Sequence, residues 1–201
     1  MFTILRAILW LILSTCIVLI IRKSKYRRKK LLSIASVVLC AVLVSVSGMF
    51  PVENLFITYQ SPERAFHYFQ SEKIKEIIDG QESCLVIYND GNSTYGYNII
   101  PKTERGYKIP SYFEMEKVSH KFDKQAALDI YNAQGTQDYY VVGTVHQKDF
   151  DSNISVCNPA KEKIDTDIIR IENTNFICFW LPNFSNGYYL RINGEEIALP
   201  D

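Results

Sequence analysis

The first 50 residues of this chain contain no aspartate and no glutamate, although the whole sequence has 22 acidic residues. The same segment holds eight of the 22 lysines and arginines, so residues 1–50 and 51–201 carry formal charges of +8 and −8. Such a partition is typical of a chain that a membrane divides between two environments. The acidic balance of residues 51–201 also argues against nucleic-acid binding, which needs clustered cations.

The sequence also lacks the short motifs on which many enzyme and cofactor sites depend. It has no Gly-x-Ser-x-Gly elbow, no phosphate-binding glycine loop, no dinucleotide fingerprint and no Cys-x-x-Cys or His-x-x-x-His pair. We therefore assign no catalytic, cofactor-binding or metal-binding residue and expect no cofactor. Carboxylate pairs for glycoside hydrolysis stay open, because the fold rather than the sequence brings such pairs together.

Metal-binding patterns are equally weak. His67 lies on a predicted helix, and His120 and His146 lie on separate predicted strands, so only the fold could assemble a site from them. The segment 149–155 begins like a calcium loop, with Asp-x-Asp-x-Asn spacing. It has Ile154 where that loop needs glycine, so we expect an acidic turn there.

The three cysteines of residues 51–201 each lie in an apolar, strand-like run. This placement of Cys84, Cys157 and Cys178 predicts buried free thiols. One disulfide with a cysteine left over is the alternative, and the sequence does not decide between these redox states. A nucleophilic thiol would need a nearby base and a lowered pKa, and no local pattern supplies them.

Two long apolar runs, 2–21 and 31–50, predict a transmembrane helical hairpin. Only Arg6 interrupts the first run, and the second has no charged residue. Twenty helical residues span about 30 Å, the thickness of the hydrocarbon core of a bilayer. A cleavable signal sequence is the alternative for the second run, since Ser45-Val-Ser47 has the form of a cleavage site.

The segment 22–30 between the runs carries seven positive charges in nine residues. Short loops rich in lysine and arginine stay in the cytoplasm, so we expect both termini and residues 51–201 to lie outside. The predicted location is therefore the plasma membrane, with two spans. The basic loop would lie against anionic lipid headgroups, which fixes the topology and makes membrane lipid an expected partner.

Residues 51–201 read as one mainly β domain of about 150 residues, long enough to bury a core. Ser61-Pro62-Glu63 predicts the start of one short helix, with an N-cap, a proline at the first position and an acidic residue at the positive end of the dipole. A break near Ser71 precedes short β-favouring runs, of which 74–78 and 83–88 flank an Asp-Gly turn. Further runs separated by turn residues predict antiparallel strands and an α+β fold class, with the strand order left open.

Twelve of the 13 tyrosines and nine of the 11 phenylalanines lie in residues 51–201. Cross-strand packing explains aromatic residues in sheets, and a platform for sugar or peptide is the alternative.

The segment Ser61-Pro-Glu-Arg-Ala-Phe-His-Tyr-Phe69, followed by Ser83-Cys-Leu-Val-Ile-Tyr88, resembles uncharacterised membrane-anchored proteins of Gram-positive bacteria. Their outer domains begin with a similar Ser/Thr-Pro-Glu-x-Ala-Phe segment. The resemblance covers much of 55–195 and implies a cell-surface location and a fold, without an activity.

These observations predict a membrane-anchored, non-enzymatic module whose outer domain binds a protein or envelope partner as a sensor or accessory. One alternative is a cell-envelope hydrolase with a site assembled by the fold. Another is a structural subunit of a membrane complex. The ligand and the oligomeric state are not determined by the sequence.

Overall fold

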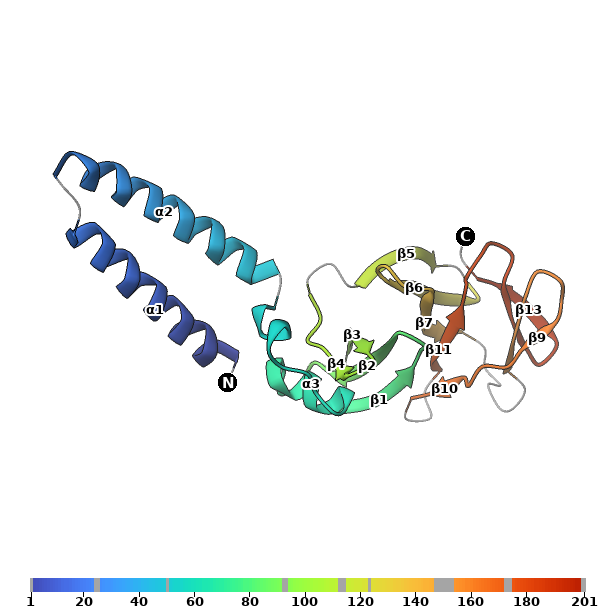
Figure 1. Cartoon of the computed structure of the whole chain (residues 1–201). Helices are drawn as coiled ribbons and strands as arrows, with labels where there is room; N and C mark the ends of the chain where they lie inside the picture. The colour runs from blue at the N-terminus through green and yellow to red at the C-terminus, as the bar shows by residue number, and fades with distance from the viewer. Residues whose placement is uncertain are drawn as a thin grey trace.

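The structure is a computed structural model that describes residues 2–23, 26–49, 51–91, 94–111, 115–122, 124–146, 154–171 and 175–199. Figure 1 shows two long antiparallel helices at one end of the molecule and a domain of short strands at the other. We call residues 51–201 the β domain. It is mainly antiparallel, with few helices, as the sequence predicts.

The helical hairpin consists of α1 (Phe2–Lys23) and α2 (Tyr26–Met49). Residues 22, 23 and 26–30 of the predicted loop 22–30 belong to the two helices. Residues 24 and 25 between the helices are not described. Lysine and arginine favour helix about as well as leucine, so the basic residues that follow Tyr26 can form the first turn of α2. Among the described residues, no helix reaches the combination of length and apolarity required for crossing a membrane.

The β domain begins with two short helices and a four-stranded sheet. The 3-10 helix η1 (Val52–Leu55) precedes α3 (Pro62–Phe69), where the backbone N–H of Arg64 donates to Ser61 Oγ at 3.4 Å and so confirms the predicted cap. The first sheet has the order β1-β2-β3-β4. Its strands are β1 (Ile74–Asp79), β2 (Ser83–Asn89), β3 (Tyr95–Thr103) and β4 (Gly106–Tyr107).

Two more antiparallel sheets follow. The central sheet has the order β10-β11-β7-β6-β5. Its strands are β5 (Met115–Phe122), β6 (Ala126–Ala133), β7 (Asp138–Val145), β10 (Ile169–Arg170) and β11 (Phe176–Pro182). The third sheet has the order β13-β12-β8-β9. Its strands are β8 (Ile154–Cys157), β9 (Lys163–Ile164), β12 (Tyr189–Ile192) and β13 (Glu195–Ala198). The sequence did not predict β9, which is only two residues long.

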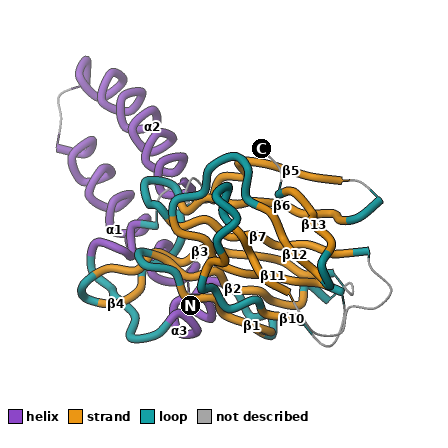
Figure 2. The backbone as a smooth tube through the Cα atoms, turned by 90° about the vertical axis from the view of Figure 1, so that its right-hand side faces the viewer, coloured by secondary structure: helices purple, strands orange, loops and turns teal. Residues whose placement is uncertain are grey.

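Three hydrophobic clusters order these elements into layers, with α3, the first sheet, the central sheet and the third sheet in succession. Strand β2 lies inside this stack and buries both faces. Its Cys84 and Val86 pack with Phe66 of α3, whereas Leu85 and Ile87 face the central sheet. Because successive side chains of a strand point to opposite faces, such a strand needs apolar residues at every position. Figure 2 shows the helical hairpin projecting away from the stacked strands.

Candidate functional site

One carboxyl group is buried in the β domain and joins the first sheet to the central sheet. Asp138, the first residue of β7, is 1% exposed. Its Oδ1 accepts hydrogen bonds from Gln81 N at 2.9 Å and from Trp180 Nε1 at 2.8 Å. Its Oδ2 accepts from Glu82 N and Ser83 Oγ, both at 2.8 Å. Four donors therefore bond to one side chain. These bonds are needed because leaving a buried carboxyl group unpaired would cost free energy of folding.

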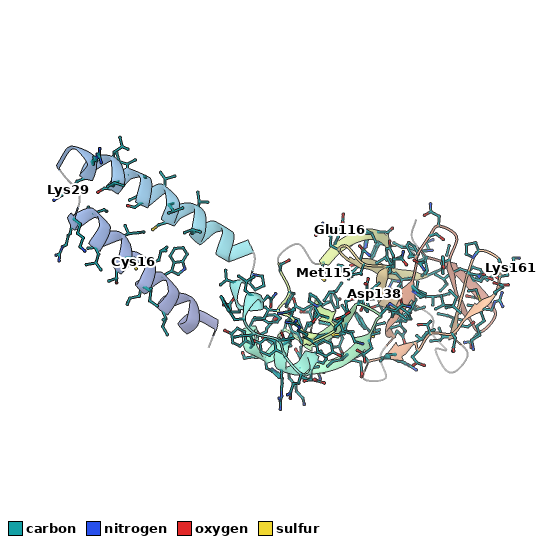
Figure 3. The ribbon with its side chains drawn as sticks, viewed as in Figure 1. Cys16, Lys29, Met115, Glu116, Asp138 and Lys161 are labelled. Atoms are coloured by element: carbon teal, nitrogen blue, oxygen red, sulfur yellow. The ribbon has the colours of Figure 1, made fainter. Side chains whose placement is uncertain are left out.

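The carboxyl group positions the turn between β1 and β2 over the central sheet. A Cβ added to Gly80 would lie 2.5 Å from Tyr140 Oη and 2.7 Å from Asp138 Cγ, so the turn needs glycine to approach this closely. The Tyr140 hydroxyl lies 2.8 Å from Ser83 Oγ and extends the network, and burial raises the pKa of Tyr140. In Figure 3, Asp138 lies inside the body of the β domain, whereas Lys161 lies at the end remote from the helical hairpin.

Two buried tyrosine hydroxyls should respond in opposite ways to removal. The hydroxyl of Tyr59 is buried and has no hydrogen-bond partner within the part of the chain that the structure describes, whereas that of Tyr140 is paired with Ser83. We expect Tyr59→Phe to leave stability unchanged or to raise it by about 1 kcal/mol, because it removes an unpaired polar atom. We expect Tyr140→Phe to cost about 1 kcal/mol, because it breaks a buried hydrogen bond. Urea unfolding of both variants of the full chain in detergent measures the difference, and an equal loss in the two would contradict it.

A cleft opens beside this network, between β1 of the first sheet and the β10 edge of the central sheet. Its volume is about 380 Å³, within the range of small-ligand pockets. The lining residues are Ile77, Ile78, Asp79, Asp165, Thr166, Asp167, Ile169 and Trp180. The cleft thus brings three exposed aspartates together with one tryptophan and three isoleucines.

Hydrogen bonds to the body of the domain hold the side of the cleft that belongs to the central sheet. The indole of Trp180 is held by Asp138, at the 2.8 Å given above. The segment that carries Asp165 and Asp167 is tied to β11, because Thr166 Oγ1 donates to the carbonyl oxygen of Trp180 at 2.6 Å. Carboxyl groups and an aromatic face are the groups that bind an organic cation, through ion pairs and cation–π contact. The cleft is therefore suited to a cationic ligand.

A second polar cluster lies on β5 and β6, away from the cleft. Asp129 Oδ1 accepts from His120 Nδ1 and pairs with Lys117 Nζ at 2.7 Å, and Tyr131 Oη donates to Oδ2 at 3.3 Å. Burial raises the pKa of Asp129, but hydrogen bonds from Lys117 and His120 outweigh it and hold the pKa below the usual range. His120 thus contacts a carboxyl group rather than a hydroxyl or thiol, which makes the cluster a surface ion pair.

The structure does not bring the three histidines together. His67 is exposed on α3, His120 lies on β5, and His146 is exposed just after β7. Among the described residues, no group of His, Cys, Asp and Glu is placed to hold a metal ion. Most of the calcium-like segment 149–155 lies outside the described residues.

The cysteines of the β domain are buried, as predicted, and the structure has all three as free thiols. Two of them lie in different layers, since Cys84 belongs to the cluster beneath α3 and Cys178 to the cluster between the first and central sheets. Burial raises the pKa of the Cys84 thiol and raises that of Cys178 to about 12. Both stay protonated at neutral pH, which is the opposite of what a nucleophilic thiol requires.

Four aromatic residues pack together between the first and central sheets, which favours packing over a ligand platform at these positions. Tyr97 stacks on Phe176 at a centroid distance of 6.3 Å and lies 5.7 Å from Tyr131, between the first and central sheets. Tyr95 lies 4.9 Å from the same Phe176 ring. These rings form a row along the sheet interface, where they join the first sheet to the central one.

Sequence analysis missed the residues of the cleft and of its support. Asp138 and Trp180 are 42 residues apart and Asp79 is more distant still, so no spacing rule connects them. One weak signal was present, because a charged residue at Asp138 directly precedes the apolar run 139–142. A search of family models, of curated proteins and of solved structures found no match to this chain.

Proposed function

We propose that this chain is a membrane-anchored binding module whose β domain holds a cationic group of a partner at the cell surface. The cleft between β1 and β10 carries the proposal. Asp79, Asp165 and Asp167 line a cavity of about 380 Å³, and Trp180 lines it as well. The partner chemistry that fits is an amine or guanidinium, such as a lysine or arginine side chain of a protein or an amino group of the envelope.

The location of the module rests on residues 1–50. Both apolar runs, 2–21 and 31–50, are about as long as a hydrocarbon core is thick. Large apolar side chains of α1 and α2 are widely exposed, for example Leu11 at 70% and Val37 at 68%. A helix that is apolar in many directions needs an apolar environment. The seven charges of 22–30 favour a cytoplasmic turn near anionic lipid headgroups, with the β domain outside.

A binding role suits the described polar groups better than catalysis does. His120 is engaged with Asp129, and the thiols of Cys84 and Cys178 are buried with raised pKa values. The carboxyl groups of the cleft are exposed, so they can attract a cation without a large desolvation cost. The likeness to membrane-anchored proteins of Gram-positive bacteria stays a prediction and agrees with this role.

The proposal is tested by titrating the full chain in detergent with hexalysine while Trp180 fluorescence is recorded. The chain has two tryptophans, so Trp10→Phe makes Trp180 the only reporter. We expect saturable binding of hexalysine and none of hexaglutamate. We expect Asp165→Asn/Asp167→Asn to weaken binding about tenfold, because each lost ion pair at a partly open site contributes about 0.5–1 kcal/mol.

The matched control is Glu116→Gln/Glu195→Gln, which removes the same charge from exposed positions on β5 and β13. Equal weakening in the two double variants would mean that hexalysine responds only to net charge, and the cleft would lose its role. Failure of hexalysine to change Trp180 fluorescence would also overturn the proposal.

A further inference from the structure

Two large apolar side chains are strongly exposed where the β domain begins. Leu55 is 78% exposed and Phe56 is 79% exposed. We call these two residues the Leu55–Phe56 patch. They lie on and just after η1, which follows α2 after only two intervening residues. Leaving two adjacent large apolar side chains in water is unfavourable relative to burying them.

The patch is held in place by a rigid frame. The backbone N–H groups of Phe56 and Ile57 both donate to the carbonyl oxygen of Glu53, at 3.0 and 2.8 Å. The Asn54 side chain donates to Ile109 O at 2.7 Å and accepts from Ile109 N at 2.9 Å, which ties η1 to the segment after β4. The exposure of Leu55 and Phe56 is therefore a property of the fold and not of a loose end.

Polar and basic groups border the patch on one side. A groove of about 390 Å³ is lined by Leu55, Phe56, Thr58, Thr103, Glu104, Arg105 and Lys108. Lys108 Nζ is used internally, since it donates to the carbonyl oxygens of Asn54 and Ile57. Arg105, at the turn between β3 and β4, is the exposed cation of the groove, with Glu104 beside it. Apolar side chains next to an arginine match the layering of a membrane interface, where acyl chains meet phosphate groups.

The position of the patch along the chain puts it near the bilayer. Leu55 follows Met49, the last residue of α2, by six residues, which span at most about 20 Å when fully extended. If α2 ends at the membrane surface, the patch cannot lie far from the headgroups. Figure 1 shows η1 between the end of α2 and α3, on the side of the β domain that faces the helical hairpin.

We propose that the Leu55–Phe56 patch inserts into the interface of the bilayer that holds α1 and α2, with Arg105 at the level of the lipid phosphates. This inference rests on the proposed membrane anchor. It adds a third attachment point beyond the two helices, and it holds the β domain in one orientation on the membrane instead of leaving it on a free tether.

Photocrosslinking of the full chain in vesicles of phosphatidylcholine and phosphatidylglycerol tests the inference. The photoreactive residue p-benzoylphenylalanine is placed at one of three positions, 56, 122 or 39, and lipid adducts are quantified by intact-protein mass spectrometry. Phe122 on β5 is the matched control, since it is also aromatic and 76% exposed. Leu39 lies within the second apolar run and reports on the anchor itself.

We expect position 56 to give about tenfold more lipid adduct than position 122, as burial of one aromatic side chain in an apolar phase predicts. Adduct at position 39 together with background levels at both 56 and 122 would overturn the insertion and leave the anchor standing. Absence of adduct at position 39 would instead refute the anchor, and the insertion with it. Equal adduct at 56 and 122 would show unspecific contact and would also overturn the inference.

Discussion

Asp138→Asn is expected to lower the free energy of unfolding of the β domain by about 3 kcal/mol or more. The carboxyl group accepts hydrogen bonds from two backbone N–H groups, one hydroxyl and one indole N–H. An asparagine keeps only one acceptor oxygen and turns its NH₂ group toward other donors. Because the side chain is 1% exposed, at least one of the four donors then loses its acceptor and cannot bond to water instead.

The loss can be measured without altering Trp180, which is itself part of the network. Urea unfolding of the full chain in detergent is followed by pulse labelling of Cys84 and Cys178, which are buried in the folded state. Asp167→Asn is the control, because its carboxyl group is exposed and its removal should change stability by no more than about 0.5 kcal/mol. A loss below about 1 kcal/mol for Asp138→Asn would contradict a structural role for this carboxyl group.

Gly143→Ala should be as damaging, for a steric reason. Gly143 lies in the middle of β7, opposite Leu128 of β6 and Ile177 of β11. A Cβ at this position would lie 2.0 Å from the carbonyl oxygen of Ala127 and 2.8 Å from Leu128 Cα, both backbone atoms. Backbone atoms in a paired central strand cannot move aside as a flexible side chain can. We expect a loss of about 3 kcal/mol, at the upper end of overpacking costs.

Gly135→Ala separates this clash from backbone strain. Gly135 has a φ of +83° in the turn between β6 and β7, and an added Cβ there would meet nothing within 4 Å. Its replacement should therefore cost only the left-handed backbone penalty, about 1 kcal/mol. The same urea unfolding assay compares the two variants. If both lose the same amount, steric overlap at Gly143 is not the cause.

Local patterns predicted most elements of the β domain because those elements depend on neighbours in sequence. Ser61-Pro62-Glu63 carries its own capping chemistry, and α3 begins there. The alternation of Tyr95, Tyr97 and Ile99 places all three on the face toward the central sheet, as expected from the period of a strand. By contrast, β9 has only two residues and no pattern of its own, so its pairing with β8 was not predictable.

The sequence by itself determined the charge partition between residues 1–50 and 51–201, the two apolar runs and the strand-rich character of the β domain. These properties are sums over adjacent residues, so no tertiary contact is needed to read them. Only the tertiary structure decided the stacking of three sheets, the burial of Asp138 beneath the 80–82 turn and the cleft at Trp180. Each of these depends on contacts between residues far apart in the chain, such as the hydrogen bond between Ser83 and Asp138, 55 positions apart. Local propensity carries no record of such pairings, because they form only when whole sheets pack face to face.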